Sequence, residues 1–315
     1  MKTIMRWFGV VSLTLGVVSL VPGLANAADN PAGFETSAVK NNDCSAKDPI
    51  KVGYSSWSED VLEAKLLKRL LEKRYGCEVQ TQRLSVGVKF QALAKRDIDV
   101  MFEAWFPKTH KSYWEKFSTK MWNVGPLYMG AQLGWAVPDY VPKDEVSSIK
   151  DLKKDSVRKK MGGKVQGIDP GSGLMQHSQD AMTDYGLNDY NLIKASGTAM
   201  TAALQRAIDN KEWTVVTLWT PHWAFGRFDL RFLDDPKGSL GAVEHSDKLV
   251  RAGFYQDYPT VAAMLSRMTI SLSTLQGFMY DADQTSNKKA IDKFIKEHAN
   301  DVHYWMTGKH SSDAT

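Results

Sequence analysis

The chain has 315 residues, of which 43% are hydrophobic and 24% are charged, and this composition excludes an intrinsically disordered protein. It is long enough for one large core or two smaller ones. Its 40 basic and 36 acidic residues are spread along the sequence and leave a formal charge of only +4. Because no basic tract is present to follow a phosphate backbone, we expect no nucleic-acid partner.

The first 27 residues have the three parts of a secretory signal peptide. Lys2 and Arg6 precede an apolar run at residues 9–21, and residues 25–27 form a small-residue cleavage site. The alternative is a membrane anchor, but the apolar run is shorter than the roughly 20 residues that a spanning helix needs. No lipoprotein cysteine follows the run, so we expect a periplasmic protein.

The two cysteines, Cys44 and Cys77, are expected to form a disulfide bond. In an exported protein such a pair is more typical of a disulfide than of a metal site or a nucleophile. The bridge would join the segment before the first strand to the start of the second. Residues 28–48 are predicted to be a leader to the folded part, and residues 309–315 a flexible tail.

Strand and helix patterns alternate from residue 50 onward. Ser56 and Glu59 have the spacing of a capping box at the start of a helix. The expected elements of this first block are strands at 50–55, 78–83 and 98–102 and a second helix at 88–96. Together they predict a parallel sheet covered by helices.

A second block of the same kind begins after the proline-bounded segment 138–142. Its expected elements are strands at 164–168, 192–195 and 213–218 and helices at 174–185 and 198–210, with a tight turn at residues 169–173. The tail from 258 to 306 has a helical pattern, is broken near 271–273 and 285–286, and is expected to pack on the first block.

These two blocks predict an α/β protein with two lobes joined by a hinge. Lobe I is expected to comprise residues 49–135 and 245–308, and lobe II residues 136–244.

Three of the 10 tryptophans have related positions in this scheme. Trp57, Trp105 and Trp219 each follow a predicted strand. Ligands of open α/β sheets bind at the carboxyl ends of the strands, so these indoles are expected to face a ligand. Any one of them alone would more often be a core aromatic residue.

An indole face attracts cations, most effectively a weakly hydrated cation that donates no hydrogen bond, so a quaternary ammonium compound fits such a cluster. A sugar is the weaker alternative, because few planar polar side chains lie beside the tryptophans. A ligand carboxylate would need an anion site. The helix starts at Ser58 and Glu59 and at Ser172 each offer unpaired backbone N–H groups.

Other polar residues near the tryptophans have open roles. Glu103 is either a second cation contact or a structural carboxylate, and His222 either orients its loop or donates to the ligand. The histidines show no metal-binding spacing, and no nucleophile elbow occurs. We therefore expect no catalytic residues, no metal and no cofactor.

Six segments, in this order, carry a resemblance to a known family: VGYSSWSE (52–59), FEAWFPKTH (102–110), GWAVP (134–138), GIDPGSG (167–173), WTPHW (219–223) and DLRFLDDP (229–236). They resemble the glycine betaine substrate-binding proteins of ABC importers, of the OpuAC type. The resemblance implies a bilobal, type II periplasmic-binding-protein fold that closes on a quaternary ammonium compound. It implies that Trp105 and Trp219 belong to the aromatic box, with Trp57 beside them and the amides after it near the ligand carboxylate.

The sequence departs from the family at residues 268–271, where some members carry another tryptophan and a histidine that contacts the carboxylate. Trp57, Tyr128 or Trp135 could complete the box, and choline, carnitine or dimethylsulfoniopropionate are alternative ligands. The expected partner is an ABC permease in the inner membrane, and the protein itself is expected to be a monomer. An exported enzyme acting on methylated amines and a regulatory receptor domain are the alternatives from other classes.

Overall fold

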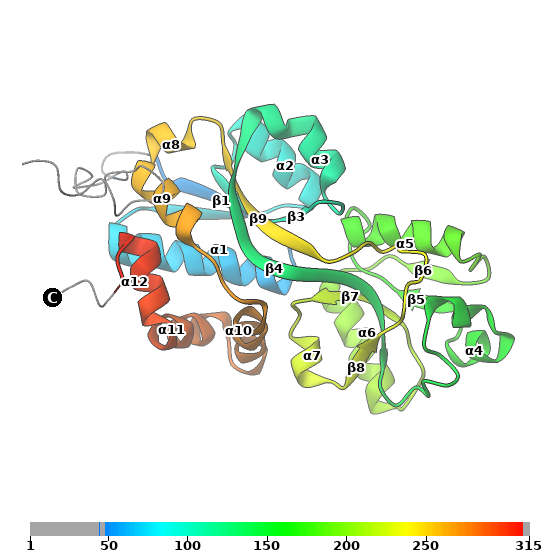
Figure 1. The fold of residues 1–315 in the computed structure, drawn as a ribbon. Helices are drawn as coiled ribbons and strands as arrows, with labels where there is room; N and C mark the ends of the chain where they lie inside the picture. Colours follow the sequence, from blue (N-terminus) through cyan, green and yellow to red (C-terminus); the bar gives the residue numbers. More distant parts are fainter. Residues whose placement is uncertain (1–43, 45–47, 311–315) are drawn as a thin grey trace, which may run out of the picture.

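The computed structural model describes residue 44 and residues 48–310. The predicted signal peptide, most of the predicted leader and residues 311–315 lie outside the described residues. Two groups of elements lie end to end (Figure 1), and the long strand β4, Met121–Pro138, runs through both. We call the group that contains β1 to β3 and β9 lobe I, and the group that contains β5 to β8 lobe II.

The strands of lobe I follow the order β2-β1-β3-β9-β4. β1 (Ile50–Tyr54) pairs in parallel with β2 (Val79–Arg83) and β3 (Val100–Phe106), whereas β9 (Glu244–Arg251) is antiparallel to both β3 and β4. The helices of this lobe are α1 (Ser58–Leu70), α2 (Val86–Lys95), α3 (Lys111–Phe117), α8 (Phe254–Asp257), α9 (Pro259–Arg267), α10 (Leu272–Gln284), α11 (Asn287–Glu297) and α12 (Ala299–Thr307), with short helical turns at Leu71–Tyr75 and Ser118–Lys120.

Lobe II continues the same sheet in the order β4-β7-β5-β6, with β8 on the other edge of β4. The part of β4 from residue 132 onward pairs antiparallel with β7 (Val216–Thr220) and β8 (Leu230–Phe232). The remaining elements are β5 (Lys164–Gln166), β6 (Asn191–Ile193), α4 (Asp155–Lys160), α5 (Gly173–Asp184), α6 (Gly197–Asp209), α7 (Ala224–Arg227) and the helical turn Ile149–Lys153.

The alternating elements of both blocks agree with the sequence to within a few residues, and the strands predicted in the first block do pair in parallel, but two further strands join the sheet. β4 and β9, which no sequence pattern indicated, lie antiparallel to their neighbours and run from one lobe toward the other. Their burial does not alternate strictly, and glycine and proline residues interrupt β4. A strand of this kind has no period-2 signature to find. The breaks near 271 and 285 do separate α9, α10 and α11, which pack with α12 against lobe I.

The predicted capping box at Ser56 and Glu59 is also wrong. α1 begins at Ser58 with Trp57 as its N-cap residue, and no side chain caps it. The carboxylate that reaches back across this turn belongs to Asp60, whose Oδ2 accepts the Ser55 N–H at 2.6 Å. Because Asp60 accepts the backbone N–H of this turn, the Glu59 side chain does not serve as a capping residue.

Two of the three tryptophans that were expected just after strands, Trp105 and Trp219, lie within the strands instead. β3 runs on to Phe106 and β7 to Thr220, so Trp105 and Trp219 are the last residues but one of their strands. Both side chains are still at the carboxyl ends, which is the edge that binds ligands in an open α/β sheet.

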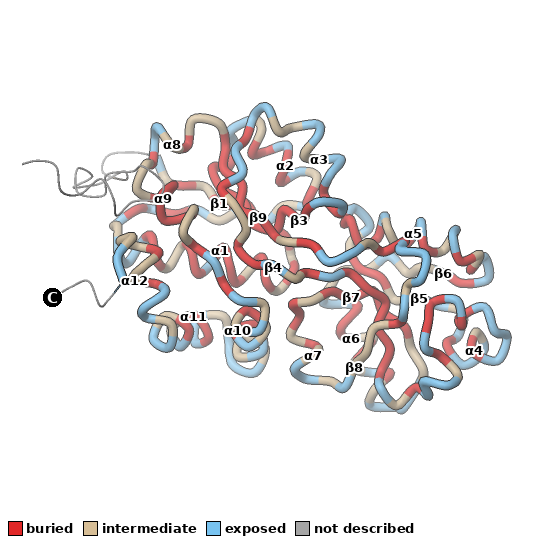
Figure 2. Tube along the Cα trace, in the orientation of Figure 1, coloured by how far each residue is buried: buried red, intermediate tan, exposed pale blue. Residues whose placement is uncertain are grey.

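Buried residues concentrate along the strands and on the sheet-facing sides of the helices (Figure 2). One apolar cluster fills lobe I and extends to Ile168, Leu174 and Trp219 in lobe II. A second cluster lies wholly in lobe II around Trp135 and Val165. The larger core therefore reaches across the junction of the lobes.

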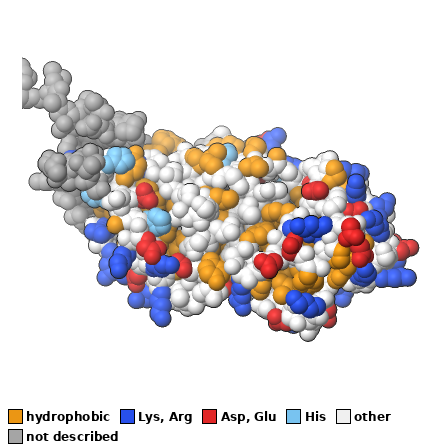
Figure 3. Space-filling model, turned by 60° about the horizontal axis from the view of Figure 1, so that its bottom comes forward, with side chains coloured by type: hydrophobic (Ala, Val, Ile, Leu, Met, Phe, Trp, Pro, Cys, Tyr) orange, Lys and Arg blue, Asp and Glu red, His pale blue; other side chains and the backbone are white. Residues whose placement is uncertain are grey.

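On the face shown in Figure 3, basic and acidic side chains are interspersed over both lobes. Within the described part of the chain, no helix has both the length and the apolar composition required to cross a membrane.

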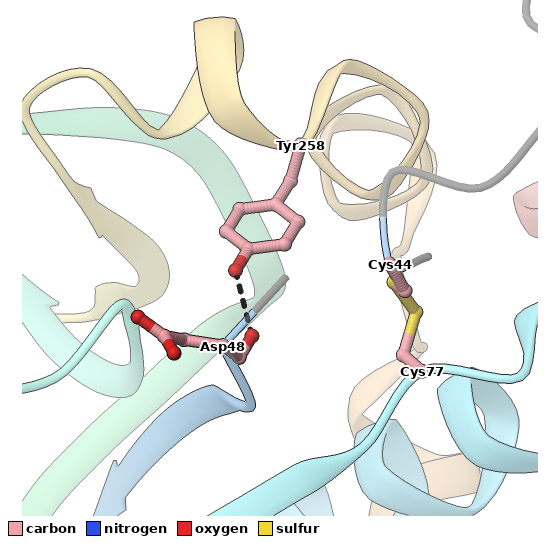
Figure 4. The surroundings of a disulfide bond; sticks show 4 residues. All are labelled: Cys44, Asp48, Cys77 and Tyr258. Atoms are coloured by element: carbon pink, nitrogen blue, oxygen red, sulfur yellow. Dashed lines mark hydrogen bonds between the residues drawn. A yellow bond between two sulfur atoms is a disulfide. The ribbon is translucent and has the colours of Figure 1, made fainter. Parts of the chain in front are cut away.

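The predicted disulfide between Cys44 and Cys77 is present (Figure 4). It fastens the segment before β1 to the turn before β2. Close by, the Tyr258 hydroxyl donates to the Asp48 carbonyl oxygen at 3.0 Å, so this segment is also tied to the C-terminal helices.

Replacing both cysteines by serine should lower the free energy of unfolding by about 2–4 kcal/mol, because the bridge closes a loop between residues 33 positions apart. Urea unfolding followed by tryptophan fluorescence measures the change. A reducing agent should destabilise the wild-type protein similarly and leave the double variant unaffected. Equal stability of the oxidised wild type and the variant would contradict the prediction.

Candidate functional site

A cavity lies where the two lobes meet, at the carboxyl ends of β3 and β7 and the starts of α1 and α5. The predicted residues that line it are Trp57, Glu59, Glu103, Trp105, Ser172 and Trp219. Trp57, Trp105 and Trp219 are 8%, 4% and 4% exposed, so three indoles from both lobes are nearly removed from solvent around one cavity.

Trp105 is held in place by three contacts. Its Nε1 donates to Glu103 Oε2 at 2.5 Å, its backbone N–H donates to His110 Nδ1 at 2.9 Å, and its ring meets Tyr128 edge-on at 6.3 Å. The backbone of Glu103 has a positive φ of 61°, at a register shift between β3 and β9. Such a strained conformation persists only where its surroundings fix it, and it brings Glu103 and Trp105 to the same cavity.

Trp219 and Trp57 are fixed by buried polar groups behind them. The His222 ring lies edge-on to Trp219 at 4.7 Å, and its Nδ1 accepts the Ala224 N–H at 3.0 Å. The Lys89 Nζ lies 5.7 Å from the Trp57 ring centroid and is itself held by Asp60 Oδ2 at 2.5 Å. Each indole therefore has a rigid support outside the cavity.

The carboxylic side chains of the cavity wall are unusual because both are buried. Glu59 is 1% exposed and Glu103 is 0% exposed. Burial, followed by the neighbouring Glu103 charge, raises the pKa of Glu59 well above its usual range. Burial also raises the pKa of Glu103, but its hydrogen bonds from Tyr128 and Trp105 counteract this effect.

His110 offers the cavity a neutral hydrogen-bond donor. Burial lowers the pKa of this imidazole to about 3, so it carries no charge at neutral pH. Its Nδ1 accepts the Trp105 N–H, which places the proton on Nε2. That Nε2 is buried and has no hydrogen-bond partner among the described residues, so it is available to a ligand.

The first turn of α5 is a second donor site. Ser172 is its N-cap residue, and the side-chain oxygen accepts the Met175 N–H at 3.3 Å. Gly173 and Leu174 follow it in the cavity wall. The first backbone N–H groups of a helix have no intrahelical acceptor, and they carry the positive end of the helix dipole.

Four predicted residues are not brought into the cavity wall. Ser58 donates to Glu59 Oε2 at 3.3 Å, Tyr128 lies behind Trp105, and His222 lies behind Trp219. Trp135 is in the separate core of lobe II, where its Nε1 donates to Ser178 at 2.9 Å.

Thr109, His110, Leu133 and Gly173 also line the cavity, although the sequence patterns did not predict them as site residues. His110 had a signal, since it ends the segment that contains Glu103 and Trp105. Its spacing from other histidines matches no metal site, so only this neighbourhood indicates a role in binding.

Polar contacts join the two lobes at several places. The Tyr113 hydroxyl donates to the Gly171 carbonyl oxygen at 3.5 Å, and Arg227 pairs with Asp283 at 3.2 Å. At Gly173 the approach is closest, because a Cβ there would lie 2.4 Å from Thr109 Cγ2 and 2.8 Å from its carbonyl oxygen. The absence of a side chain at Gly173 thus permits this arrangement of the lobes.

Residues 48–297 match the sequence profile of the substrate binding domain of the ABC-type glycine betaine transport system, OpuAC. The chain belongs to this family. It is 37% identical over 166 residues to the glycine betaine/carnitine transport binding protein GbuC of Listeria monocytogenes, an alignment covering 52% of this chain and 55% of that protein. The chain therefore spans only about half the length of this curated relative.

Solved structures extend the likeness over most of the described chain. The closed lactococcal OpuAC, in complex with glycine betaine, has a TM-score of 0.76 at 31% identity and covers 82% of this chain and 100% of its own. The glycine betaine/L-proline-binding protein ProX of Borrelia burgdorferi has a TM-score of 0.76 at 32% identity, covering 82% and 96%. These likenesses confirm the predicted α/β, type II periplasmic-binding-protein fold. OpuAC is a family of transport components, not of enzymes.

Substituting Gly173 by alanine should weaken binding of glycine betaine by about tenfold or more. The added methyl group has to displace the Thr109 backbone and hold the lobes apart. Isothermal titration calorimetry measures the affinity. Gly171→Ala is the matched control in the same turn, because its Cβ would meet no atom within 4 Å. Equal affinities for the two variants would contradict a role for this contact in closure.

Proposed function

We propose that this protein captures glycine betaine or a close quaternary ammonium relative outside the cytoplasm and presents it to an ABC permease in the inner membrane. The observation that carries the proposal is the meeting of Trp57, Trp105 and Trp219 around one buried cavity. Membership of the OpuAC family and the likeness to a glycine betaine complex support it.

A methylated ammonium group suits this cavity because it needs no hydrogen-bond acceptor. Each desolvated contact with an indole face contributes about 2 kcal/mol. The carboxyl groups of Glu59 and Glu103 add a negative potential at the same wall. A neutral sugar would gain neither term.

The ligand carboxylate is proposed to bind between His110 Nε2 and the start of α5, rather than at the amides after Trp57. At α1 the first turn already carries two acidic side chains, Glu59 and Asp60, and Asp60 accepts the Ser55 N–H. No acidic residue is present in the first turn of α5. A zwitterion such as glycine betaine uses both ends of the cavity, whereas choline uses only the aromatic end.

Binding is proposed to act by closing the lobes, which each carry part of the site. A ligand shifts such an equilibrium only through its different affinity for the open and closed forms. The predicted lobe boundaries at residues 135 and 245 remain proposals about which parts move. β4 changes partners from β9 to β7 between Ala131 and Gln132, close to the first of these boundaries. We further propose a monomeric, periplasmic protein.

Trp105→Ala and Trp219→Ala should each weaken glycine betaine binding by at least tenfold, since each removes one indole face from the cation. Calorimetry on the purified proteins gives the affinities. Trp122→Ala is the matched control, because Trp122 is 45% exposed and lies outside the cavity. Unchanged affinity in both cavity variants would reject the aromatic box.

His110→Leu should weaken glycine betaine binding by about tenfold while changing choline affinity by less than about threefold, because choline has no carboxylate for Nε2 to bind. The measured quantity is the ratio of the two dissociation constants. An equal loss for both ligands would show that His110 acts only by positioning Trp105.

A further inference from the structure

Four buried carboxyl groups lie together where lobe I meets the cavity. Glu59, Asp60 and Glu63 belong to α1 and Glu103 to β3, and none is more than 1% exposed. Two buried lysines are near them. Lys89 pairs with Asp60, whereas Lys248 donates to the carbonyl oxygens of Pro126 and Met268, both at 2.7 Å. Carboxylates packed this closely cannot all be ionised at once.

Two of the four carboxyl groups, Asp60 and Glu103, accept hydrogen bonds that counteract the rise of their pKa by burial. Asp60 Oδ2 accepts from Lys89 Nζ and from the Ser55 N–H. Glu103 accepts from Trp105 Nε1 at 2.5 Å, from the Tyr128 hydroxyl at 2.7 Å and from the Ser246 hydroxyl at 3.4 Å. Donors of this kind favour the charged form of a carboxyl group.

The other two carboxyl groups differ in their access to the cavity. Glu63 lies behind Glu103 and does not line the cavity, and burial together with the Glu103 charge raises its pKa. Glu59 does line the cavity, and among the described residues the Ser58 hydroxyl donates to it at a long 3.3 Å. Glu59 is therefore the carboxyl group that a bound cation would contact.

We propose that Glu59 is the anionic contact of the ligand's ammonium group, that it carries a proton in the ligand-free protein, and that cation binding releases this proton to solvent. The proposal rests on the function proposed above. In the empty cavity the ionised form would be a buried charge beside Glu103 and Asp60. A quaternary ammonium in the aromatic box supplies the missing positive charge.

Glu59 lies among several ionisable groups. Its charge interacts with those of Asp60 and Glu63 of α1, Glu103 of β3 and Tyr128 of β4. Lys89 of α2 pairs with Asp60, Lys248 of β9 interacts with Glu63, His110 shares the cavity wall, and His222 packs on Trp219. Burial holds both histidines neutral, with a pKa of about 3. The Glu59 backbone N–H and the Trp219 side chain favour its ionised form but are outweighed by burial and by Glu103.

The coupling fixes the direction of the pH dependence. The free protein holds a proton that the complex lacks, so affinity rises with pH, by up to tenfold per unit while Glu59 is protonated in the free protein. Reciprocally, the ligand lowers the pKa of Glu59 by the same free energy.

Calorimetry with glycine betaine at pH 7.5, in phosphate and in Tris, tests the proposal because both buffer at this pH and differ in ionisation enthalpy. The difference in apparent binding enthalpy should correspond to release of up to one proton per ligand. Glu59→Gln should abolish the release and make a weakened affinity independent of pH. Glu63→Gln, which alters a titratable group outside the cavity wall, should retain the release.

A wild-type protein with no buffer-dependent enthalpy, or a Glu59→Gln variant that releases the same proton, would overturn the proposal. Glu59→Asp guards against misfolding, since it should keep the proton release at a lower affinity. Absence of any binding to glycine betaine or choline would instead reject the proposed function, so the two failures are distinguishable.

Discussion

A cation that donates no hydrogen bond is held mainly by aromatic faces and by nearby negative charge, and both are built into the junction of the two lobes. The three indoles come from separate elements, and each is fixed from behind by a polar group. Glu103 and His110 hold Trp105, His222 supports Trp219, and Lys89 lies over Trp57. The aromatic cavity therefore depends on a layer of buried polar residues, of which Glu103 and His110 also line the cavity while Lys89 and His222 do not.

Burying these charged and polar side chains is energetically unfavourable, and this explains how their partners are arranged. A buried carboxylate without partners is strongly unfavourable. Asp60 is paired with the buried Lys89, and Glu103 accepts hydrogen bonds from three donors. At Glu59 and Glu63 the pKa is raised, which favours their neutral form. The strained backbone of Glu103 belongs to the same arrangement. Such unfavourable features are tolerated at a site because they are balanced when the site is filled.

Besides the aromatic faces and the nearby negative charge, the site requires that the two halves of the cavity come together. β4 pairs with β9 in one lobe and with β7 in the other, so a continuous strand links the sheet regions that carry Trp105 and Trp219. At the other side of the cavity Gly173 permits α5 to approach Thr109 closely. The start of α5 and His110 thereby reach the same cavity as the indoles.

The sequence by itself determined the alternating α/β blocks, the disulfide and the family, because hydrophobic periodicity, cysteine pairing and short motifs are local properties of the chain. It also singled out Trp57, Trp105 and Trp219 from their places near strand ends. Only the tertiary structure decided that β4 and β9 run antiparallel to their neighbours, that Trp135 is a core residue, and that Thr109 and His110 line the cavity. Those facts depend on pairing and burial between residues far apart in the chain, which leave no local pattern to read.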